Sequence, residues 1–480
     1  MTSHFGTFEF STIEHEIGHA LGLKHGHDPG GNGALSADRN DVEFSIMTYA
    51  SYFGADASAP NTVVDGSMPR TFMMYDIAAL QTYYGANFSK VGTAVTYSWD
   101  PGTGQELIDN ASAPNMGATS TSTIFDTVWT QGATATYDLT SFSADQVDDM
   151  RQGFWMTFSP TQLAQLNSAD LTAKAQGNVY NTLLNNGDTR SEIYDLNSGS
   201  GSDYIYGNDV NNIIHSNDGN DDIRGGGGSN ALYGDAGDDW LIAEGTNDSL
   251  IGGTGDDTYV ISSSSAVIVE QPGEGTDTAL VFIDNYTIGA NVEIGYLAAG
   301  VTTVTGNDTG MTITGHNGTG ATINGGTGND TLIGGDPADT LRGGHGNDVL
   351  IGGPGNDTFA FARGDGNDTV HASATDGTDV VGFDAGVAYD QLWFAQSNND
   401  LVVSVIGENQ AITVAGWHAS TNNQFGQIDA DDGFFATASA VDQLVQAMSA
   451  FTPPALGQTT LPTVLADALA PALTTNWQHS

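Results

Sequence analysis

The sequence predicts an α+β portion at the N-terminus, then an all-β parallel β-roll built from two repeat arrays, and finally a C-terminal β and helical segment. Three observations predict this order: a histidine motif in an apolar pattern of helical period, a nine-residue unit rich in Gly and Asp, and late strand-like runs that give way to a helical pattern. We expect the chain to divide into 1–90, 91–197, 198–262, 263–324, 325–375, 376–435 and 436–480.

The composition restricts the possible classes of function. The 480 residues include 58 Asp and Glu but only 10 Lys and Arg, and the formal net charge of −48 repels nucleic acid and anionic membranes. Cysteine is absent, so a transition metal must be held by His and carboxylate ligands. No apolar stretch reaches membrane-spanning length. We therefore expect no nucleic-acid partner and no membrane insertion, and a fold that cations help to complete.

Residues 1–90 contain the motif that predicts chemistry. His15-Glu16-Ile17-Gly18-His19 places two imidazoles one helical turn apart, with Glu16 beside them as a general base. Gly22 can end the helix and turn the chain, so that His25 becomes a third ligand. Three neutral histidines leave the fourth tetrahedral position to water, as in catalytic zinc sites. We expect one Zn²⁺ on His15, His19 and His25, and peptide hydrolysis by metal-activated water with Glu16 as its base.

The motif is followed by Ser45-Ile46-Met47-Thr48-Tyr49, and together they resemble the zinc motif and Met-turn of a metzincin. With a second helical pattern at Met73 to Tyr84 and the nine-residue repeats, the chain resembles the serralysin family of secreted bacterial metalloproteases from about residue 7 to about 375. The resemblance implies a catalytic role for Tyr49, which would approach the zinc and stabilise the tetrahedral intermediate, and an apolar floor beneath the metal formed by Met47. Gly26 departs from the proline that many serralysins have after the third histidine.

That family has a substantial half of its catalytic domain before the zinc helix. Here only fourteen residues precede His15. We therefore expect an N-terminally incomplete metzincin catalytic portion, with Met1 an internal start or the chain a fragment that alone is inactive or weakly active. The alternative is a deliberately compact protease.

The nine-residue unit follows the pattern G-G-x-G-x-D-x-U-x, where U is a large apolar residue, and resembles the RTX (haemolysin-type) repeat. Its sixth position recurs every nine residues in two arrays, and the U residues two places later keep the same phase. Looser copies upstream pair Asp203 with Ile205 and Asn211 with Ile213. Glycine turns that expose carbonyl oxygens, together with an Asp carboxylate, supply the hard ligands that calcium prefers. We expect several structural Ca²⁺ ions at Asp203, Asp221, Asp239, Asp248, Asp257, Asp330, Asp339, Asp348 and Asp357.

The remaining segments predict β structure and an export signal. Runs of alternating residues at 91–197, the Val/Thr/Ile-rich stretch 263–324 and the runs after 376 are typical of strands. Ala438 to Phe451 has helical spacing and precedes a Pro/Ala/Leu-rich tail. The family resemblance implies export by a type I ABC transporter that reads residues 436–480. A helix that only caps the preceding β domain is the alternative.

These patterns together predict a secreted, extracellular bacterial zinc endopeptidase that acts on proteins or peptides and folds with calcium. The alternative is a non-enzymatic RTX calcium-binding surface or adhesion protein that carries an incomplete protease domain. The complete set of Glu16 and three histidines favours the enzyme, whereas the expected absence of an upstream half favours the alternative for this isolated chain.

Overall fold

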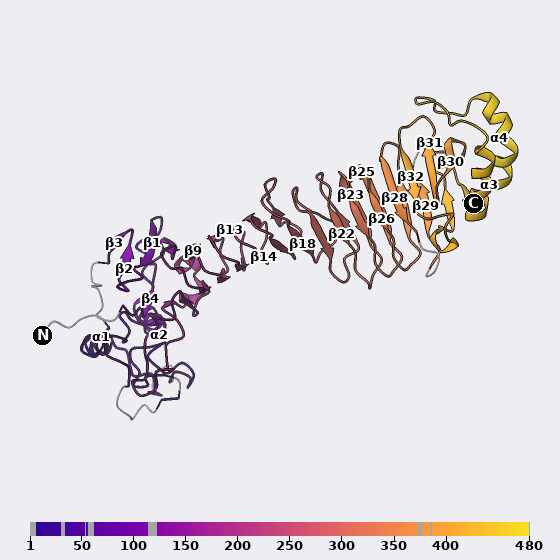
Figure 1. The fold of residues 1–480 in the computed structure, drawn as a ribbon. Coiled ribbons are helices and arrows are strands. Elements are labelled where there is room, and N and C mark those ends of the chain that lie inside the picture. Colours follow the sequence, from indigo (N-terminus) through magenta and orange to yellow (C-terminus); the bar gives the residue numbers. More distant parts are fainter. Residues whose placement is uncertain are drawn as a thin grey trace. The chain divides into compact units, whose positions relative to one another are not determined.

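The computed structural model describes residues 6–29, 34–52, 54–55, 62–113, 122–372, 377–384 and 386–479. The chain divides into two compact units: Met1–Asp257 with Ser265–Val267, and Thr258–Ser264 with Ile268–Ser480. Strands dominate both units, as Figure 1 shows. Among the helices of the described residues, none is long and apolar enough to cross a membrane.

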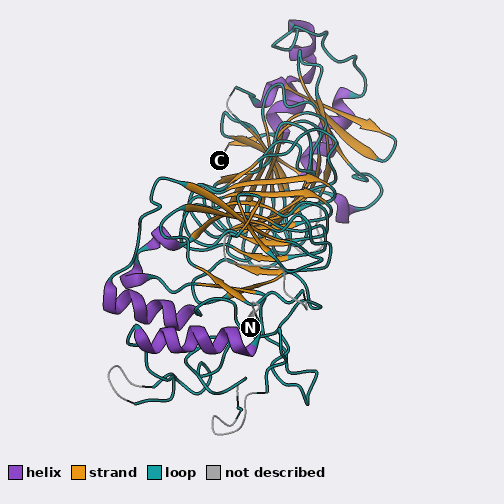
Figure 2. Cartoon of the chain, turned by 90° about the vertical axis from the view of Figure 1, so that its left-hand side faces the viewer, coloured by secondary structure: helices purple, strands orange, loops and turns teal. Residues whose placement is uncertain are grey.

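Two helices of the first unit frame the histidine motif. Helix α1 (Phe8–Ala20) begins at Thr7, whose side chain accepts a hydrogen bond from the Phe10 N–H. It ends before Gly22, whose φ of 91° turns the chain as the sequence predicts. Helix α2 (Met74–Tyr84) ends at Gly85 and lies beside α1, where the Tyr84 hydroxyl donates to the Leu21 carbonyl at 2.8 Å (Figure 2).

The stretch 91–197 forms short strands that share a core with the segment around α2. Phe44 and Met47 pack with Phe125 and Tyr180 in one buried cluster. Strand β1 pairs in parallel with β5, and β5 with β9, so this stretch leads directly into the roll. The strands are β1 (Ala94–Trp99), β2 (Glu106–Ile108), β3 (Ala111–Ser112), β4 (Asp126–Val128), β5 (Thr134–Asp138), β6 (Val147–Asp149), β7 (Trp155–Thr157), β8 (Val179–Asn181) and β9 (Ile193–Asn197), with 3₁₀ turns at Asn185–Gly187 and Thr189–Ser191.

The first repeat array is a parallel β-roll in which each nonapeptide supplies one strand. Ile205 pairs with Ile223 and Ile223 with Leu241, so two repeats, or 18 residues, complete one turn. The side chains of these three residues are fully buried, as the U positions require. The strands are β10 (Tyr204–Tyr206), β11 (Ile213–His215), β12 (Asp222–Arg224), β13 (Ala231–Ala236), β14 (Trp240–Ala243) and β15 (Ser249–Thr254).

The sequence pattern predicts Asn211 and Ile213 as the sixth and U positions of one upstream repeat, and the structure shows that both positions lie one residue later. Ile213 is 49% exposed, whereas Ile214 is fully buried and pairs with Leu232. Asn212, not Asn211, takes the position of the repeat aspartate, because its N–H donates to Asn230 Oδ1. The side-chain period of a strand is two, so a shift by one residue exchanges the interior and exterior faces.

The second unit continues the same parallel stacking, also through the stretch between the arrays. There Ala279 pairs with Gly295 and Gly295 with Ile313, although no G-G-x-G-x-D turn is present. Successive strands of this unit lie side by side in Figure 1. They are β16 (Thr258–Ile261), β18 (Thr278–Val281), β19 (Tyr286–Thr287), β20 (Ile294–Leu297), β21 (Thr303–Thr305), β22 (Thr312–Thr314), β23 (Thr322–Thr327), β24 (Thr331–Ile333), β25 (Thr340–His345), β26 (Val349–Ile351), β27 (Thr358–Phe361), β28 (Asn367–His371) and β29 (Val380–Phe383), while β17 (Val267–Ile268) falls where the chain passes between the units.

The C-terminal segment combines a β-hairpin with two helices. Its elements are β30 (Leu392–Ser397), β31 (Asp400–Val405), β32 (Ala411–Val414), β33 (Gln427–Asp429), β34 (Phe434–Thr437), α3 (Ala438–Met448), α4 (Thr463–Asn476) and β35 (Gln478–His479), with 3₁₀ turns at Tyr389–Gln391 and Thr421–Asn423. The Pro/Ala/Leu-rich tail after Phe451 contains helix α4, which the sequence did not predict and which has Pro471 inside it.

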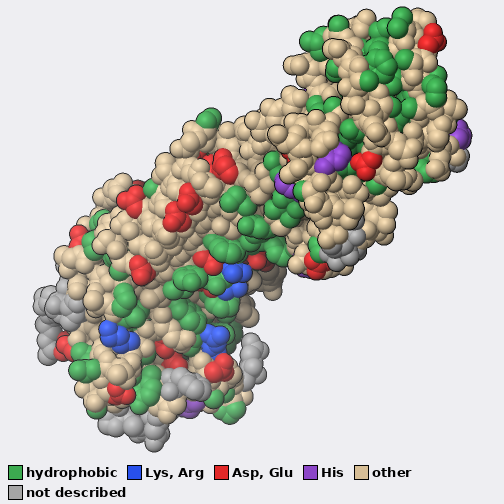
Figure 3. Space-filling model, turned by 45° about the vertical axis from the view of Figure 1, so that its right-hand side comes forward, with side chains coloured by type: hydrophobic (Ala, Val, Ile, Leu, Met, Phe, Trp, Pro, Cys, Tyr) green, Lys and Arg blue, Asp and Glu red, His purple; other side chains and the backbone are tan. Residues whose placement is uncertain are grey.

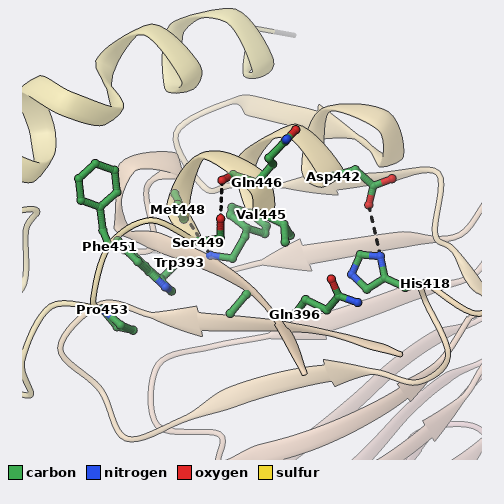
Figure 4. A pocket seen from close by; sticks show the side chains of 12 residues that line it. Trp393, Gln396, His418, Asp442, Val445, Gln446, Met448, Ser449, Phe451 and Pro453 are labelled. Atoms are coloured by element: carbon green, nitrogen blue, oxygen red, sulfur yellow. Dashed lines mark hydrogen bonds and ion pairs between the residues drawn. The ribbon is translucent and has the colours of Figure 1, made fainter. Parts of the chain in front are cut away.

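Helix α3 covers the hairpin through the apolar residues that the sequence singled out. Leu444 and Met448 are buried, and the Phe394 N–H of β30 donates to Met448 Sδ. A cavity of about 610 Å³ remains between α3 and β30, where His418 Nδ1 lies 3.9 Å from Asp442 Oδ1 (Figure 4). The helix thus packs as part of this β domain.

Basic side chains are few and concentrated in the first unit. Only Arg342 and Arg363 belong to the second unit, and on the face drawn in Figure 3 the Lys and Arg side chains gather over the first. The carboxylates of the roll therefore have few protein cations available to neutralise them.

Candidate metal sites

The three histidines of the motif converge at the end of α1. A nitrogen of His15, one of His19 and one of His25 all lie within 4.8 Å of one another, and the Nε2 atoms of His19 and His25 are 3.0 Å apart. His15 and His19 come from successive turns of α1, while the Gly22 turn brings back His25. Three imidazole nitrogens so close together form the donor set that a tetrahedral Zn²⁺ ion accepts.

Backbone carbonyls fix the orientation of two of the rings. His15 Nδ1 lies 2.8 Å from the Ile46 carbonyl oxygen, and His19 Nδ1 lies 3.0 Å from that of Leu23. A carbonyl accepts only, so each Nδ1 carries a proton and each Nε2 offers its lone pair to the cluster. Burial, and then the neighbouring His19 and His15, lowers the pKa of His25, which favours the neutral form that binds a metal.

Met47 and Asp76 contact the segments that carry and orient the histidines. A Cβ placed on Gly18 would lie 2.4 Å from Met47 Sδ, so the sulfur packs directly against the α1 backbone between the two motif histidines. Asp76 of α2 accepts hydrogen bonds from the Ser45 hydroxyl at 2.6 Å and from the Ile46 N–H at 2.8 Å. Because the Ile46 carbonyl orients His15, Asp76 positions that ligand indirectly.

Glu16 and Tyr49 lie on the open side of the cluster. Both line a cavity of about 290 Å³ that His15 also borders. The Tyr49 hydroxyl lies 2.6 Å from His25 Nε2, so it reaches the same nitrogen that a metal would use. The arrangement leaves a carboxylate and a phenol hydroxyl beside the histidines and accessible from the cavity.

His27 belongs to a second group of possible metal ligands, which shares His25 with the first. Nitrogens of His25 and His27 and an oxygen of Asp28 also lie within 4.8 Å of one another. His25 Nδ1 is 3.7 Å from Asp28 Oδ2, a position from which the carboxylate can orient the ring. The side chain of His27 is exposed and lies outside the group formed by His15, His19 and His25.

Sequence reasoning missed the buried polar residues behind the site. Arg70 Nε donates to Asp126 Oδ1 at 2.7 Å, and this fully buried ion pair joins the segment before α2 to β4. Of these residues, Asp76 had a recognisable signal in the sequence, because it is an acidic residue in the first turn of a predicted helix.

The repeat aspartates share one geometry. Oδ1 accepts the N–H of a residue one turn earlier, as in the 2.8 Å bond from Asp221 N–H to Asp239 Oδ1. The other oxygen faces the glycine turn: a Cβ on Gly234 would lie 2.2 Å from Asp239 Oδ2 and 2.6 Å from the Gly252 carbonyl oxygen. A buried Oδ2 without a hydrogen-bond partner recurs at Asp221, Asp239, Asp330, Asp339, Asp348 and Asp357.

A calcium ion fits this arrangement. A carboxylate oxygen and glycine carbonyls converge where no donor is present, and buried acceptors rarely remain unpaired. Two predicted positions differ, because Asp203 Oδ2 accepts from the Ser198 hydroxyl and Asp248 Oδ2 from the Gly245 N–H. Asp257 Oδ1 accepts a hydrogen bond from the Asp239 N–H at 2.8 Å, as the Oδ1 atoms of the other repeat aspartates do one turn earlier or later.

Burial and mutual repulsion oppose ionisation of these carboxylates. Burial is the largest cause, and it raises the pKa of Asp239 to about 9 and that of Asp221 to about 7. The pKa values of Asp348 and Asp357 rise to about 6 for the same reason, with neighbouring carboxylates adding to the effect. Neutralisation by a cation or by protons therefore stabilises the roll.

Comparison with known proteins identifies two family models. Residues 2–68 match the reprolysin-like metallo-peptidase family M12B, and residues 197–232, 224–259 and 322–359 match the RTX calcium-binding nonapeptide repeat. Serralysin from Proteus mirabilis is 30% identical over 226 residues, which cover 44% of this chain and 38% of the relative. Metallopeptidase AprA from Pseudomonas marginalis is 28% identical over 228 residues, covering 44% and 40%.

The chain thus spans about two fifths of the length of these relatives. A solved structure, the extracellular lipase LipA from Serratia marcescens, overlaps 45% of this chain and 38% of its own at 21% identity, with a TM-score of 0.18 that supports no structural argument. The chain combines RTX calcium-binding nonapeptide repeats in a β-roll with an N-terminal portion that matches a reprolysin-like metallo-peptidase family, and serralysin and AprA metallopeptidases are among its relatives.

Proposed function

We propose that this chain belongs to a secreted zinc endopeptidase whose RTX roll folds with calcium. The observation that carries the proposal is the cluster of His15, His19 and His25, with Glu16 and Tyr49 on its open side. Two of the three rings are held by backbone carbonyls, which is the support expected of metal ligands.

When bound, zinc supplies a Lewis acid that polarises a peptide carbonyl and lowers the pKa of a water molecule to about 7. Glu16 would take the proton of the attacking water and pass it to the leaving amine, because Glu16 lines the same cavity as His15. Tyr49 would donate its hydroxyl hydrogen to the oxyanion that develops on the carbonyl. This hydroxyl lies 2.6 Å from His25 Nε2, beside the position at which the three histidines would hold the metal.

Six repeat aspartates with an unpartnered Oδ2 support the calcium part of the proposal. Extracellular calcium would neutralise the roll carboxylates and order the turns, whereas cytosolic calcium would not suffice for sites of about 10⁻⁴ to 10⁻³ M affinity. This reasoning favours export of an unfolded chain, and the family resemblance implies a type I ABC transporter that reads residues 436–480. Since α3 is buried against β30, the signal would have to be read before the segment folds.

The function is tested on the protein as its gene encodes it. We expect casein cleavage that a zinc chelator abolishes and that added Zn²⁺, but not Ca²⁺ alone, restores. Absence of cleavage by zinc-loaded, calcium-folded protein would favour the second candidate, a non-enzymatic RTX surface or adhesion protein. That candidate draws support from the short peptidase match, which spans residues 2–68.

A further inference from the structure

One outward face of the first array carries exposed aromatic side chains in register. Strand β10 pairs with β12 and β12 with β14, so Tyr204, Asp222 and Trp240 lie opposite one another in one row. The next residue of each strand is a buried U residue, so the side chains of this row point outward. Tyr204 and Trp240 are 54% and 45% exposed. Exposed apolar groups rimmed by polar residues are typical of a binding surface.

The separation of the two aromatic residues suits an extended chain of sugar rings. Neighbouring strands lie about 4.8 Å apart, so Tyr204 and Trp240, two strands apart, are separated by about 10 Å. Two successive rings of an extended β-linked glucan have nearly this length. Each of these rings presents apolar C–H groups on its faces, which pack against the face of an aromatic side chain. The row therefore offers two stacking positions to one glucan chain.

An ion pair with unused hydrogen-bonding capacity lies between the stacking positions. Asp222 is the middle residue of the row, and Arg224 follows two residues later on the same outward face. Asp222 Oδ1 and Arg224 Nε are 3.6 Å apart, and neither atom has a hydrogen-bond partner among the described residues. Both side chains are partly exposed. A carboxylate beside a guanidinium supplies the acceptors and donors that neighbouring hydroxyls of a sugar ring require.

A second arginine extends this face toward β6. The guanidinium carbon of Arg151 lies 4.3 Å from the ring centre of Phe154 and 5.0 Å from that of Tyr206, and Arg151 pairs with Asp149 at 2.6 Å. Arg224 lies over the Tyr206 ring as well, at 5.7 Å. Both arginines have carboxylate neighbours, so the face is nearly neutral although the whole chain carries a charge of −48.

The alternation of aromatic and charged groups favours a sugar polymer over a protein partner. The centre of a protein–protein interface is apolar and depleted of charged residues. Here the pair of Asp222 and Arg224 interrupts the aromatic row. A neutral glucan needs both kinds of group, because each ring combines apolar faces with hydroxyls at its edge. Near neutrality of the face also removes the attraction that a charged polymer would require.

We propose that the face formed by Tyr204, Tyr206, Asp222, Arg224 and Trp240 binds a neutral, extended β-linked glucan such as cellulose. Tyr204 and Trp240 pack against two rings of the chain, while Asp222 and Arg224 bind adjacent ring hydroxyls. The face would hold the calcium-folded protein on a polysaccharide surface. It is independent of the proposed protease function.

The test is binding of the full chain, saturated with calcium, to cellulose powder, measured as depletion of protein from solution. Tyr204→Ala and Trp240→Ala should each bind about tenfold more weakly than wild type, because each loses one stacking contact. Trp240→Phe keeps a ring and should lose less. Tyr296→Ala is the matched control, since Tyr296 is an exposed aromatic residue of a roll strand, opposite Leu280 and Thr314, and should bind as wild type does.

Two outcomes of the depletion experiment would overturn the proposal. One is no binding of the wild-type chain, and the other is an equal loss in Tyr296→Ala and Trp240→Ala. Light scattering of the same samples identifies the rival occupant. Self-association of the wild type that Trp240→Ala abolishes, without binding to cellulose, would assign the face to a second copy of this chain.

A second measurement covers variants that do not fold. Titration of the unmodified chain with cellohexaose should change its tryptophan fluorescence, because Trp240 is exposed in the free protein. Maltohexaose has the same composition but curved α-linked chains, and it should produce no comparable change. An equal response to both sugars, or none to cellohexaose, would contradict the proposal.

Discussion

At the residue scale, the chemistry of the candidate zinc site was predictable because its spacing is local. His15 and His19 lie one helical turn apart, and a single glycine, Gly22, is enough to return His25. The supporting contacts were not predictable, since Asp76 acts on the Met-turn from about thirty residues away and no local pattern reports such a bond.

Replacement of Glu16 tests whether this residue acts as the general base and not as a metal ligand. Glu16→Ala should keep its zinc, because the carboxylate is outside the three-histidine cluster, and should lose about 10²- to 10⁴-fold in turnover. Casein cleavage and metal analysis on the same preparations measure both effects. Glu9→Ala, an exposed acid of the same helix, serves as the control and should behave as wild type. Turnover in Glu16→Ala equal to that control would remove the proposed base.

At the element scale, the nine-residue period predicted the strands of both arrays and their buried residues. Leu332, Leu341, Leu350 and Phe359 are all fully buried, as the U positions required. The phase at Asn211 was wrong because its turn keeps only Gly207 of the three repeat glycines, and two adjacent asparagines are followed by two adjacent isoleucines, so both phases fit the pattern. The stretch between the arrays keeps the motif only in part, at Gly273-Glu274-Gly275-Thr276-Asp277, and without the nine-residue period, so its sequence showed strands but not their parallel stacking.

Adjacent isoleucines provide a direct test of the corrected register. Ile214→Ala should lower the free energy of unfolding by about 2–5 kcal/mol, because its side chain fills the interior. Ile213→Ala should change it by no more than about 0.5 kcal/mol, because that side chain is half exposed. Denaturant unfolding in saturating calcium measures both. A larger loss of stability for Ile213→Ala than for Ile214→Ala would show that Ile213, and not Ile214, is the interior residue.

At the scale of the whole molecule, charge decides the conditions for folding. The net charge of −48 and the few basic residues were evident from the sequence, and they predicted a dependence on cations. The structure shows which charges oppose folding. Carboxylates of the roll turns are buried, and six of them have an oxygen without a hydrogen-bond partner. Their burial depends on the stacking of turns 18 residues apart, which composition does not report.

Acid should therefore substitute in part for calcium. The folded-state pKa values of Asp221, Asp239, Asp348 and Asp357 lie above the ordinary value of 3.8, so the folded chain binds more protons than the unfolded chain between about pH 4 and pH 9. Stability of the calcium-free roll should rise as the pH falls through this range, and calcium affinity should fall with it. Far-ultraviolet circular dichroism of the chelated chain should show β structure gained on acidification. A calcium-free roll that is equally unfolded at pH 4.5 and pH 8 would contradict this expectation.

The zinc content of residues 1–480 tests the central claim most directly. Refolded in calcium and zinc and then freed of loosely bound metal, the chain should contain one zinc, because three oriented imidazole nitrogens converge at the end of α1. His15→Ala/His19→Ala should contain none, whereas His27→Ala should keep it, since His27 lies outside the cluster. Stoichiometric zinc in the double variant, or none in the wild-type chain, would contradict the account.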